Sequence, residues 1–142
     1  MNGAELETKN APAILLAQVS AAKNDEVGCW RIGWQVKNQA PQPLTMGAVR
    51  LPHGQFKAEE LRFSPALRLG PGEVAGFQIA VRCQEPPGLV TENAFVIFSV
   101  VWLGEDWRIF VRMRVVINAE GAPETATELI TTQKVGFSGV AD

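Results

Sequence analysis

The chain has 142 residues, of which 46% are hydrophobic and 20% charged, and its formal net charge is -2. A chain of this length fits one domain and buries about 68 to 70% of its unfolded surface, so its core needs no metal or disulfide. The near balance of charges excludes a general polyanion-coating protein and a disordered acidic one.

The first residues, MNGAELETKN, lack a basic segment followed by an apolar one, and the longest apolar runs are far shorter than a membrane span. We therefore expect a cytoplasmic chain that makes no membrane contact.

Turn signals recur at fairly even intervals up to residue 118, and β-branched and aromatic runs of strand length lie between them. The candidate strands are residues 13–21, 27–38, 44–51, 61–64, 74–83, 93–103 and 107–118. No segment of this region shows an apolar period of 3.6 residues. The spacing predicts an all-β, immunoglobulin-like antiparallel β-sandwich of about seven strands over residues 1–118.

The two cysteines are expected to point to opposite faces of their strands. Cys29 alternates with the apolar set that includes Trp30 and Trp34, whereas Cys83 belongs to the inward set that includes Phe77 and Val81. A disulfide between two sheets needs both thiols inside, so we predict that both thiols are free.

A hairpin joins the last two strands of this region. Gly104 suits the first central position of a two-residue type II′ turn. That turn pairs Trp102 with Trp107 and places an apolar face toward the core, formed by Val96, Phe98, Val100, Trp102, Trp107, Ile109, Val111 and Met113.

The opposite face of this hairpin mixes apolar and cationic side chains, with Ser99 and Val101 between them. Arginine and aromatic side chains together are enriched in protein interfaces and are also found on single-strand nucleic-acid platforms. The candidate binding residues are Phe95, Ile97, Arg108, Phe110, Arg112 and Arg114. Four interpretations stay open: a cover made by the chain's own tail or a second protomer, a plain solvated face, another protein, and a nucleic acid.

Residues 119–142 form a small-residue, acidic, glycine-containing tail, in which residues 123–133 predict a short helix or a partner-docking segment. Residues 27–117 hold ten Lys or Arg and seven Asp or Glu, whereas residues 118–142 hold one Lys and four Asp or Glu. We expect one of two structures to cover the outer face of the last hairpin. The first is the acidic tail, which would lie over the arginines with Leu129, Ile130 and Phe137 as apolar anchors. The same face of a second protomer is the other.

Three pieces occur in order: Trp30-x-x-x-Trp34-x-Val36-x-Asn38, Leu69-Gly70-Pro71-Gly72-Glu73 before a strand, and Pro86-Pro87-Gly88 before a long hairpin. Over residues 27–117 this pattern resembles Ig-like accessory sandwiches, including adhesion-type CARDB modules and the four-tryptophan Ig-like domain of selective autophagy receptors. It departs from the latter because Trp102 and Trp107 lie across one hairpin. The resemblance implies binding or scaffolding rather than catalysis.

No set of residues indicates a particular chemistry. His53 is the only histidine, and neither a cysteine nor a carboxylate stands at a metal-ligand spacing from it. The adjacent carboxylates Glu59-Glu60 and Glu105-Asp106 point apart or lie on a turn. We expect no enzyme, no catalytic residue, no metal and no cofactor.

These observations favour a non-catalytic protein-binding or assembly module that uses the outer face of the last hairpin, with a protein partner or self-association, including a homodimer, as its interaction. The alternatives are an accessory carbohydrate-binding domain of a larger enzyme system, which needs exposed tryptophans, and a nucleic-acid-binding platform. The acidic ends of the chain argue against the latter.

Overall fold

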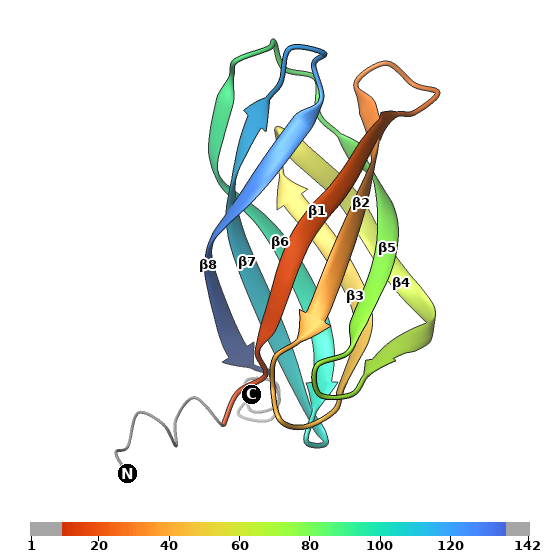
Figure 1. Cartoon of the computed structure of the whole chain (residues 1–142), viewed down its shortest axis with the longest axis vertical. Helices are drawn as coiled ribbons and strands as arrows, with labels where there is room; N and C mark the ends of the chain where they lie inside the picture. The colour runs from red at the N-terminus through yellow and green to blue at the C-terminus, as the bar shows by residue number, and fades with distance from the viewer. Residues whose placement is uncertain (1–9, 136–142) are drawn as a thin grey trace, which may run out of the picture.

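The computed structural model describes residues 10–135, which form antiparallel β-strands and no helix (Figure 1). The eight strands are β1 (Ile14–Lys23), β2 (Cys29–Asn38), β3 (Leu44–His53), β4 (Phe56–Leu69), β5 (Val74–Arg82), β6 (Val90–Trp102), β7 (Glu105–Ile117) and β8 (Pro123–Lys134). The all-β prediction is therefore confirmed. Over these residues the structure has no helix that is long and apolar enough to cross a bilayer.

The strands belong to one sheet in the order β1-β2-β5-β4-β3-β6-β7-β8, which curls until its two edge strands meet. In Figure 1, β1 and β8 lie side by side at the front. The side chain of Gln18 joins them, because its Nε2 donates to the carbonyl of Pro123 and its Oε1 accepts from the amide of Thr125, both at 2.9 Å. Strands β4 and β5 are only weakly paired, because Lys57 and Arg82 are the one pair of residues that joins them in the sheet.

The structure has eight strands where the sequence predicted seven, and the eight form a single, nearly closed sheet. The additional strand is β8, in the segment for which the sequence suggested a short helix. Residues 123–134 pair with β7 along their length, with one irregularity beside Arg112 and Met113. Several β-branched threonines and Ile130 suit a strand, and Ile130 packs against the core.

The core lies inside the curled sheet. It is built from the side chains that point inward at alternate positions of each strand. Edge-to-face aromatic contacts cross the weakly paired boundary between β4 and β5. The ring centres of Phe63 on β4 and Phe77 on β5 are 5.4 Å apart, and those of Phe77 and Phe98 on β6 are 6.0 Å apart. Three tryptophans are buried and the fourth packs against the core, as a packed aromatic core requires: Trp30, Trp34, Trp102 and Trp107.

Asn38 connects two of the sequence motifs. Its side chain is fully buried and donates to the carbonyls of Gln42 and Leu69, while its Oδ1 accepts from the amide of Ala40. Its backbone also bonds to Gly72 and Glu73. The motif that ends at Asn38 thus holds the turn that precedes β5, and both motifs have a structural role.

The hairpin between β6 and β7 turns at Leu103 and Gly104, one residue earlier than predicted. Both residues have positive φ, 52° and 72°, as a type I′ turn requires. Trp102 therefore pairs with Glu105, and the predicted register is wrong by two residues. A slip of two residues leaves every side chain on its original face, and the predicted inner face is buried apart from Trp107, which is half-buried.

Both cysteines are free, as predicted. Cys29 is half-buried, and its sulfur accepts a 3.4 Å hydrogen bond from Asn24 Nδ2. Cys83 is buried, and burial, with a contribution from the charge of Glu85, raises its pKa to about 11. Its thiolate is therefore scarce near neutral pH, which makes Cys83 a poor nucleophile.

Candidate functional site

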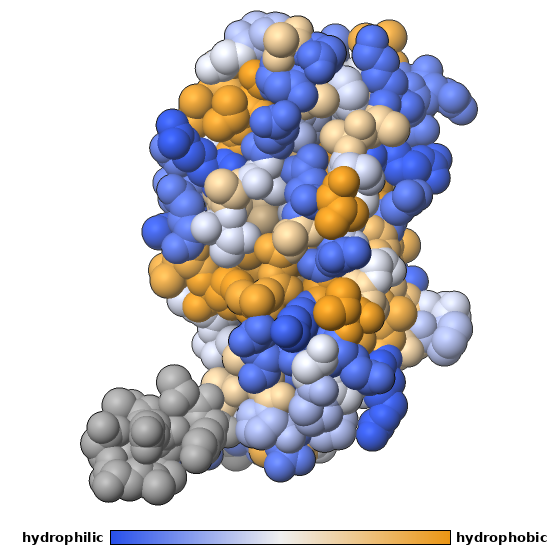
Figure 2. All heavy atoms as spheres, viewed as in Figure 1, coloured by the Kyte–Doolittle hydropathy of each residue, from blue (hydrophilic) through white to orange (hydrophobic). Residues whose placement is uncertain are grey.

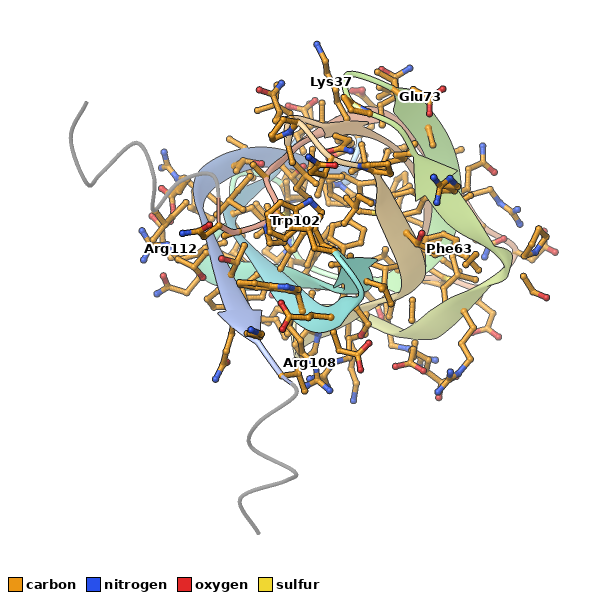
Figure 3. The ribbon with its side chains drawn as sticks, turned by 90° about the horizontal axis from the view of Figure 1, so that it is seen from below. Lys37, Phe63, Glu73, Trp102, Arg108 and Arg112 are labelled. Atoms are coloured by element: carbon orange, nitrogen blue, oxygen red, sulfur yellow. The ribbon has the colours of Figure 1, made fainter. Side chains whose placement is uncertain are left out.

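The pairing of β6 with β7 brings the predicted binding residues onto one outer face of the sheet. Phe95 lies opposite Arg112, Ile97 opposite Phe110, and Ser99 opposite Arg108. Arg114 follows on the same face of β7 and forms an ion pair with Glu92, with 3.6 Å between Arg Nε and Glu Oε2. In Figure 3, Arg108 and Arg112 lie outside the ring of strands, whereas Trp102 lies inside it.

The apolar part of this face is less exposed than the sequence suggested. Ile97 is only 7% exposed, although it points outward, because it lies between Arg50 of β3 and Phe110 of β7. Phe95 and Phe110 are half-buried, and Val101 is 43% exposed. The long neighbouring side chains shield much of the aromatic and aliphatic surface.

Strands β3 and β4 extend the same face with three arginines that the sequence analysis missed. Arg50 lies opposite Ile97, and Ala48 lies between Ser99 of β6 and Arg62 of β4. Thr45 lies between Val101 and Arg68 in the same way. We call the whole surface the arginine face; its cations are Arg50, Arg62, Arg68, Arg108, Arg112 and Arg114. Side-chain alternation could have placed Arg50 outward, but its neighbours depend on the strand order.

Few carboxylates neutralise the arginine face. Arg62 pairs with Glu60 at 3.1 Å, and Arg114 pairs with Glu92. Within residues 10–135, the ion pairs include no partner for the other four arginines, Arg50, Arg68, Arg108 and Arg112. The Nε of Arg112 is also buried without a hydrogen-bond partner in this part of the chain. The face therefore has spare donors for a planar acceptor such as a carboxylate.

The tail does not lie across this face over residues 123–135. It runs beside β7 as β8, with Leu129 opposite Arg112 and 47% exposed. Ile130 packs inward, and Phe137 lies outside the described residues. Figure 2 shows a band of apolar surface across the strands at the front. Leu15 of β1 and Leu129 of β8 are both exposed. Residues 123–135 therefore leave the arginine face uncovered, and the apolar side chain of Leu129 lies beside it.

Two other polar features lie outside the arginine face, a groove and the single histidine. A groove of about 840 Å³ follows the seam between β4 and β5, and its charged lining residues have both signs: Asp25, Glu26, Lys57, Glu59, Glu60 and Arg82. His53 accepts a hydrogen bond from the amide of Gln55 through Nδ1. No group of three or more His, Cys, Asp or Glu residues between residues 10 and 135 could hold a metal ion.

The chain matches no model of a known protein family, and a search of curated proteins finds no relative. The function must therefore be argued from the geometry of the arginine face.

Proposed function

We propose that this protein is a non-catalytic binding or assembly module that docks a protein partner on the arginine face. The observation that supports the proposal most strongly is that four arginines without an ion-pair partner between residues 10 and 135 share one sheet surface with half-buried aromatic rings. Arginine and aromatic side chains are the residues that most often dominate the free energy of binding at protein interfaces. The strands that carry these residues, β3, β4, β6 and β7, are hydrogen-bonded to one another, so the surface is preorganised.

We also propose that the fold is a closed variant of the Ig-like sandwich. In such sandwiches the first, second and fifth strands form one sheet, and the third strand pairs with the last two in the other. The neighbours β1-β2-β5 and β3-β6-β7 follow this order, and the weak β4–β5 seam lies between the two groups. β8 is then an addition at the edge of the second group. The free thiols support a reducing compartment such as the cytoplasm.

The two alternative functions have less support. A carbohydrate platform needs tryptophan rings that face solvent, but Trp30, Trp34 and Trp102 are buried. A platform for single-stranded nucleic acid needs exposed rings for base stacking, and Phe95 and Phe110 are half-buried.

Site-specific photocrosslinking in the cells that make this protein tests the proposal. A photoreactive amino acid replaces Val101, which is exposed on the arginine face, and in a matched control it replaces Gln78, which is exposed on β5 in the other group of strands. We expect a discrete protein adduct from position 101 and none of that mass from position 78. Equal adducts from both positions, or none from position 101, would contradict a docking role for this face.

A further inference from the structure

We propose that the partner presents a carboxylate-rich segment to the arginine face, with its acidic side chains held by Arg50, Arg68, Arg108 and Arg112. This inference rests on the proposed function and names the chemistry of the partner. The four guanidinium groups have no carboxylate partner between residues 10 and 135. A segment that carries several carboxylates supplies what they lack.

Small residues occupy the centre of the arginine face. Ala48 of β3 and Ser99 of β6 lie side by side between Arg62 of β4 and Arg108 of β7. Because neighbouring strands are about 4.8 Å apart, three strand steps place the backbones of Arg62 and Arg108 about 14 Å apart. A Cβ added at the adjacent Gly47 would contact only the carbonyl of Ser99, at 3.8 Å. An extended segment can therefore approach the sheet closely between two arginine-bearing strands.

The remaining arginines lie on either side of the Ala48–Ser99 pair along the strands. Arg68 lies next to Thr45, which pairs with Val101, and Arg50 pairs with Ile97 on the other side of Ala48. Arg112 lies one pair further along β7, beside Leu129. Carboxylates spaced along one extended segment meet these cations in turn, while its apolar side chains meet Val101, Phe110 and Leu129.

The type of cation favours carboxylates. The four unpaired cations are all arginines, whose planar fork binds a carboxylate through two parallel hydrogen bonds, whereas lysine acts as a point charge. Lys57 of β4 pairs with Pro52 at the edge of the same surface and adds such a point charge.

A second copy of the chain does not fit the same surface. A two-fold contact places the same patch of each protomer against the other, so it would bring the unpaired arginines together. Like charges at an interface are destabilising. The self-association that the sequence left open is therefore disfavoured through this face.

A nucleic acid fits less well than an acidic protein segment. Glu60, Glu92 and Asp106 also lie on or beside the face and would repel a continuous phosphate backbone. The half-buried rings of Phe95 and Phe110 offer little surface for stacking. A protein segment can place apolar residues where the chain has its own carboxylates.

The test measures the binding of the full chain to defined probes by fluorescence anisotropy. The probes are a short peptide of alternating Glu and Leu, the matching peptide of alternating Gln and Leu, and an oligothymidylate. We expect the Glu peptide to bind at least about tenfold more tightly than the other two at about 0.15 M salt, because it alone presents side-chain carboxylates to the arginines. Equal binding of the Gln peptide, or tighter binding of the oligothymidylate, overturns the proposal.

Matched variants locate the interaction. Arg68→Gln and Arg108→Gln should each weaken binding of the Glu peptide several-fold, and Arg108→Lys should weaken it although the charge is kept. The control is Arg31→Gln, an exposed arginine on β2 in the other group of strands. Melting temperatures confirm that the variants fold. An equal effect of Arg31→Gln assigns the binding to general charge and overturns the proposal.

Two further outcomes separate this inference from the proposed function. If the photocrosslinked partner at position 101 contacts the chain through a segment without carboxylates, the docking role stands and the inference fails. If the chain alone sediments as a dimer that Arg108→Gln dissociates, a second copy occupies the face and the inference also fails.

Discussion

At the scale of single residues, Cys83 couples the stability of the fold to pH. Its pKa rises from 9.0 to about 11, first through burial and then through the charge of Glu85. The folded chain therefore holds this proton more tightly than the unfolded chain, so the stabilisation is complete below pH 9 and is lost as the pH rises through about 11. We expect the free energy of unfolding to fall more steeply over this window in the wild-type chain than in Cys83→Ala.

Urea unfolding at several pH values provides the measurement, and Cys29→Ala serves as the control. All other ionisable groups are the same in the wild type and in Cys83→Ala, so the difference in slope isolates Cys83. Identical slopes for the wild type and Cys83→Ala would contradict the assignment.

The residues of the candidate face show which parts of a site alternation can predict. Phe95, Ile97, Arg108 and Phe110 share a face because each strand alternates and because the error in the predicted register is an even number of residues. Arg62 and Arg68 could not be placed beside them, since their position depends on β3 pairing with both β4 and β6. The shielding of Ile97 follows from the same pairing, so the sequence overestimated its exposure.

At the scale of elements, the β6–β7 turn contains a residue that does not suit its conformation. Leu103 has a φ of 52° and is 57% exposed. A non-glycine residue in this region costs about 1 to 2 kcal/mol, and asparagine tolerates it best. We expect Leu103→Asn to increase the free energy of unfolding by about 1 kcal/mol, because little apolar burial is lost.

The midpoint of urea unfolding at constant m value measures this change. Gly104→Ala is the matched variant in the same turn, and it should lower the midpoint because Gly104 has a φ of 72°. A lower midpoint for Leu103→Asn would show that the leucine side chain contributes packing that outweighs the conformational cost.

The same turn explains why the register was predicted wrongly. Glycine is the usual first residue of a type II′ turn, and a leucine at positive φ is uncommon, so the sequence favoured a turn at Gly104 and Glu105. β8 was missed for another reason. Its Pro123 and Glu124 are of types common in the first turns of helices, and the irregularity near Glu128 interrupts the alternation of a strand.

β4 was predicted too short. Residues 61–64 are only part of Phe56–Leu69, because two register shifts against β3 and an internal proline break the alternation of apolar residues. Strands that pair regularly, such as β2 and β5, were predicted to within about two residues at each end.

At the scale of the whole molecule, charge is divided between the arginine face and the ends of the chain. The net charge is -2, although residues 27–117 hold ten Lys or Arg and seven acids. An acidic partner is therefore attracted to the unpaired cations of the arginine face. Such attraction raises the association rate, and salt weakens it over a Debye length of about 8 Å at physiological ionic strength.

Side chains of both edge strands bond across the closure of the curled sheet, and Gln18 makes most of these bonds. Thr127 Oγ1 of β8 also donates to the carbonyl of Leu16 on β1, at 3.5 Å. Gln18 of β1 donates to the carbonyl of Pro123 and accepts from both the amide and the hydroxyl of Thr125 on β8, each at 2.9 Å. Gln18→Ala leaves these groups without their partner at the seam, which costs about 1 to 3 kcal/mol for a poorly solvated donor or acceptor. We expect this loss in the free energy of unfolding, together with faster amide exchange in β1 and β8 than in β3 and β6.

Hydrogen exchange and urea unfolding measure the two effects, and Gln35→Ala is the control because Gln35 is an exposed glutamine on the neighbouring strand β2. Gln18→Glu keeps the acceptor for Thr125 but removes the donor to Pro123, so its loss should lie between those of the wild type and Gln18→Ala. If Gln18→Ala and Gln35→Ala were equally stable and exchanged alike, the predicted role of Gln18 would be wrong. The remaining contacts between β1 and β8, such as the bond from Thr127 to Leu16, would then hold the two edges together.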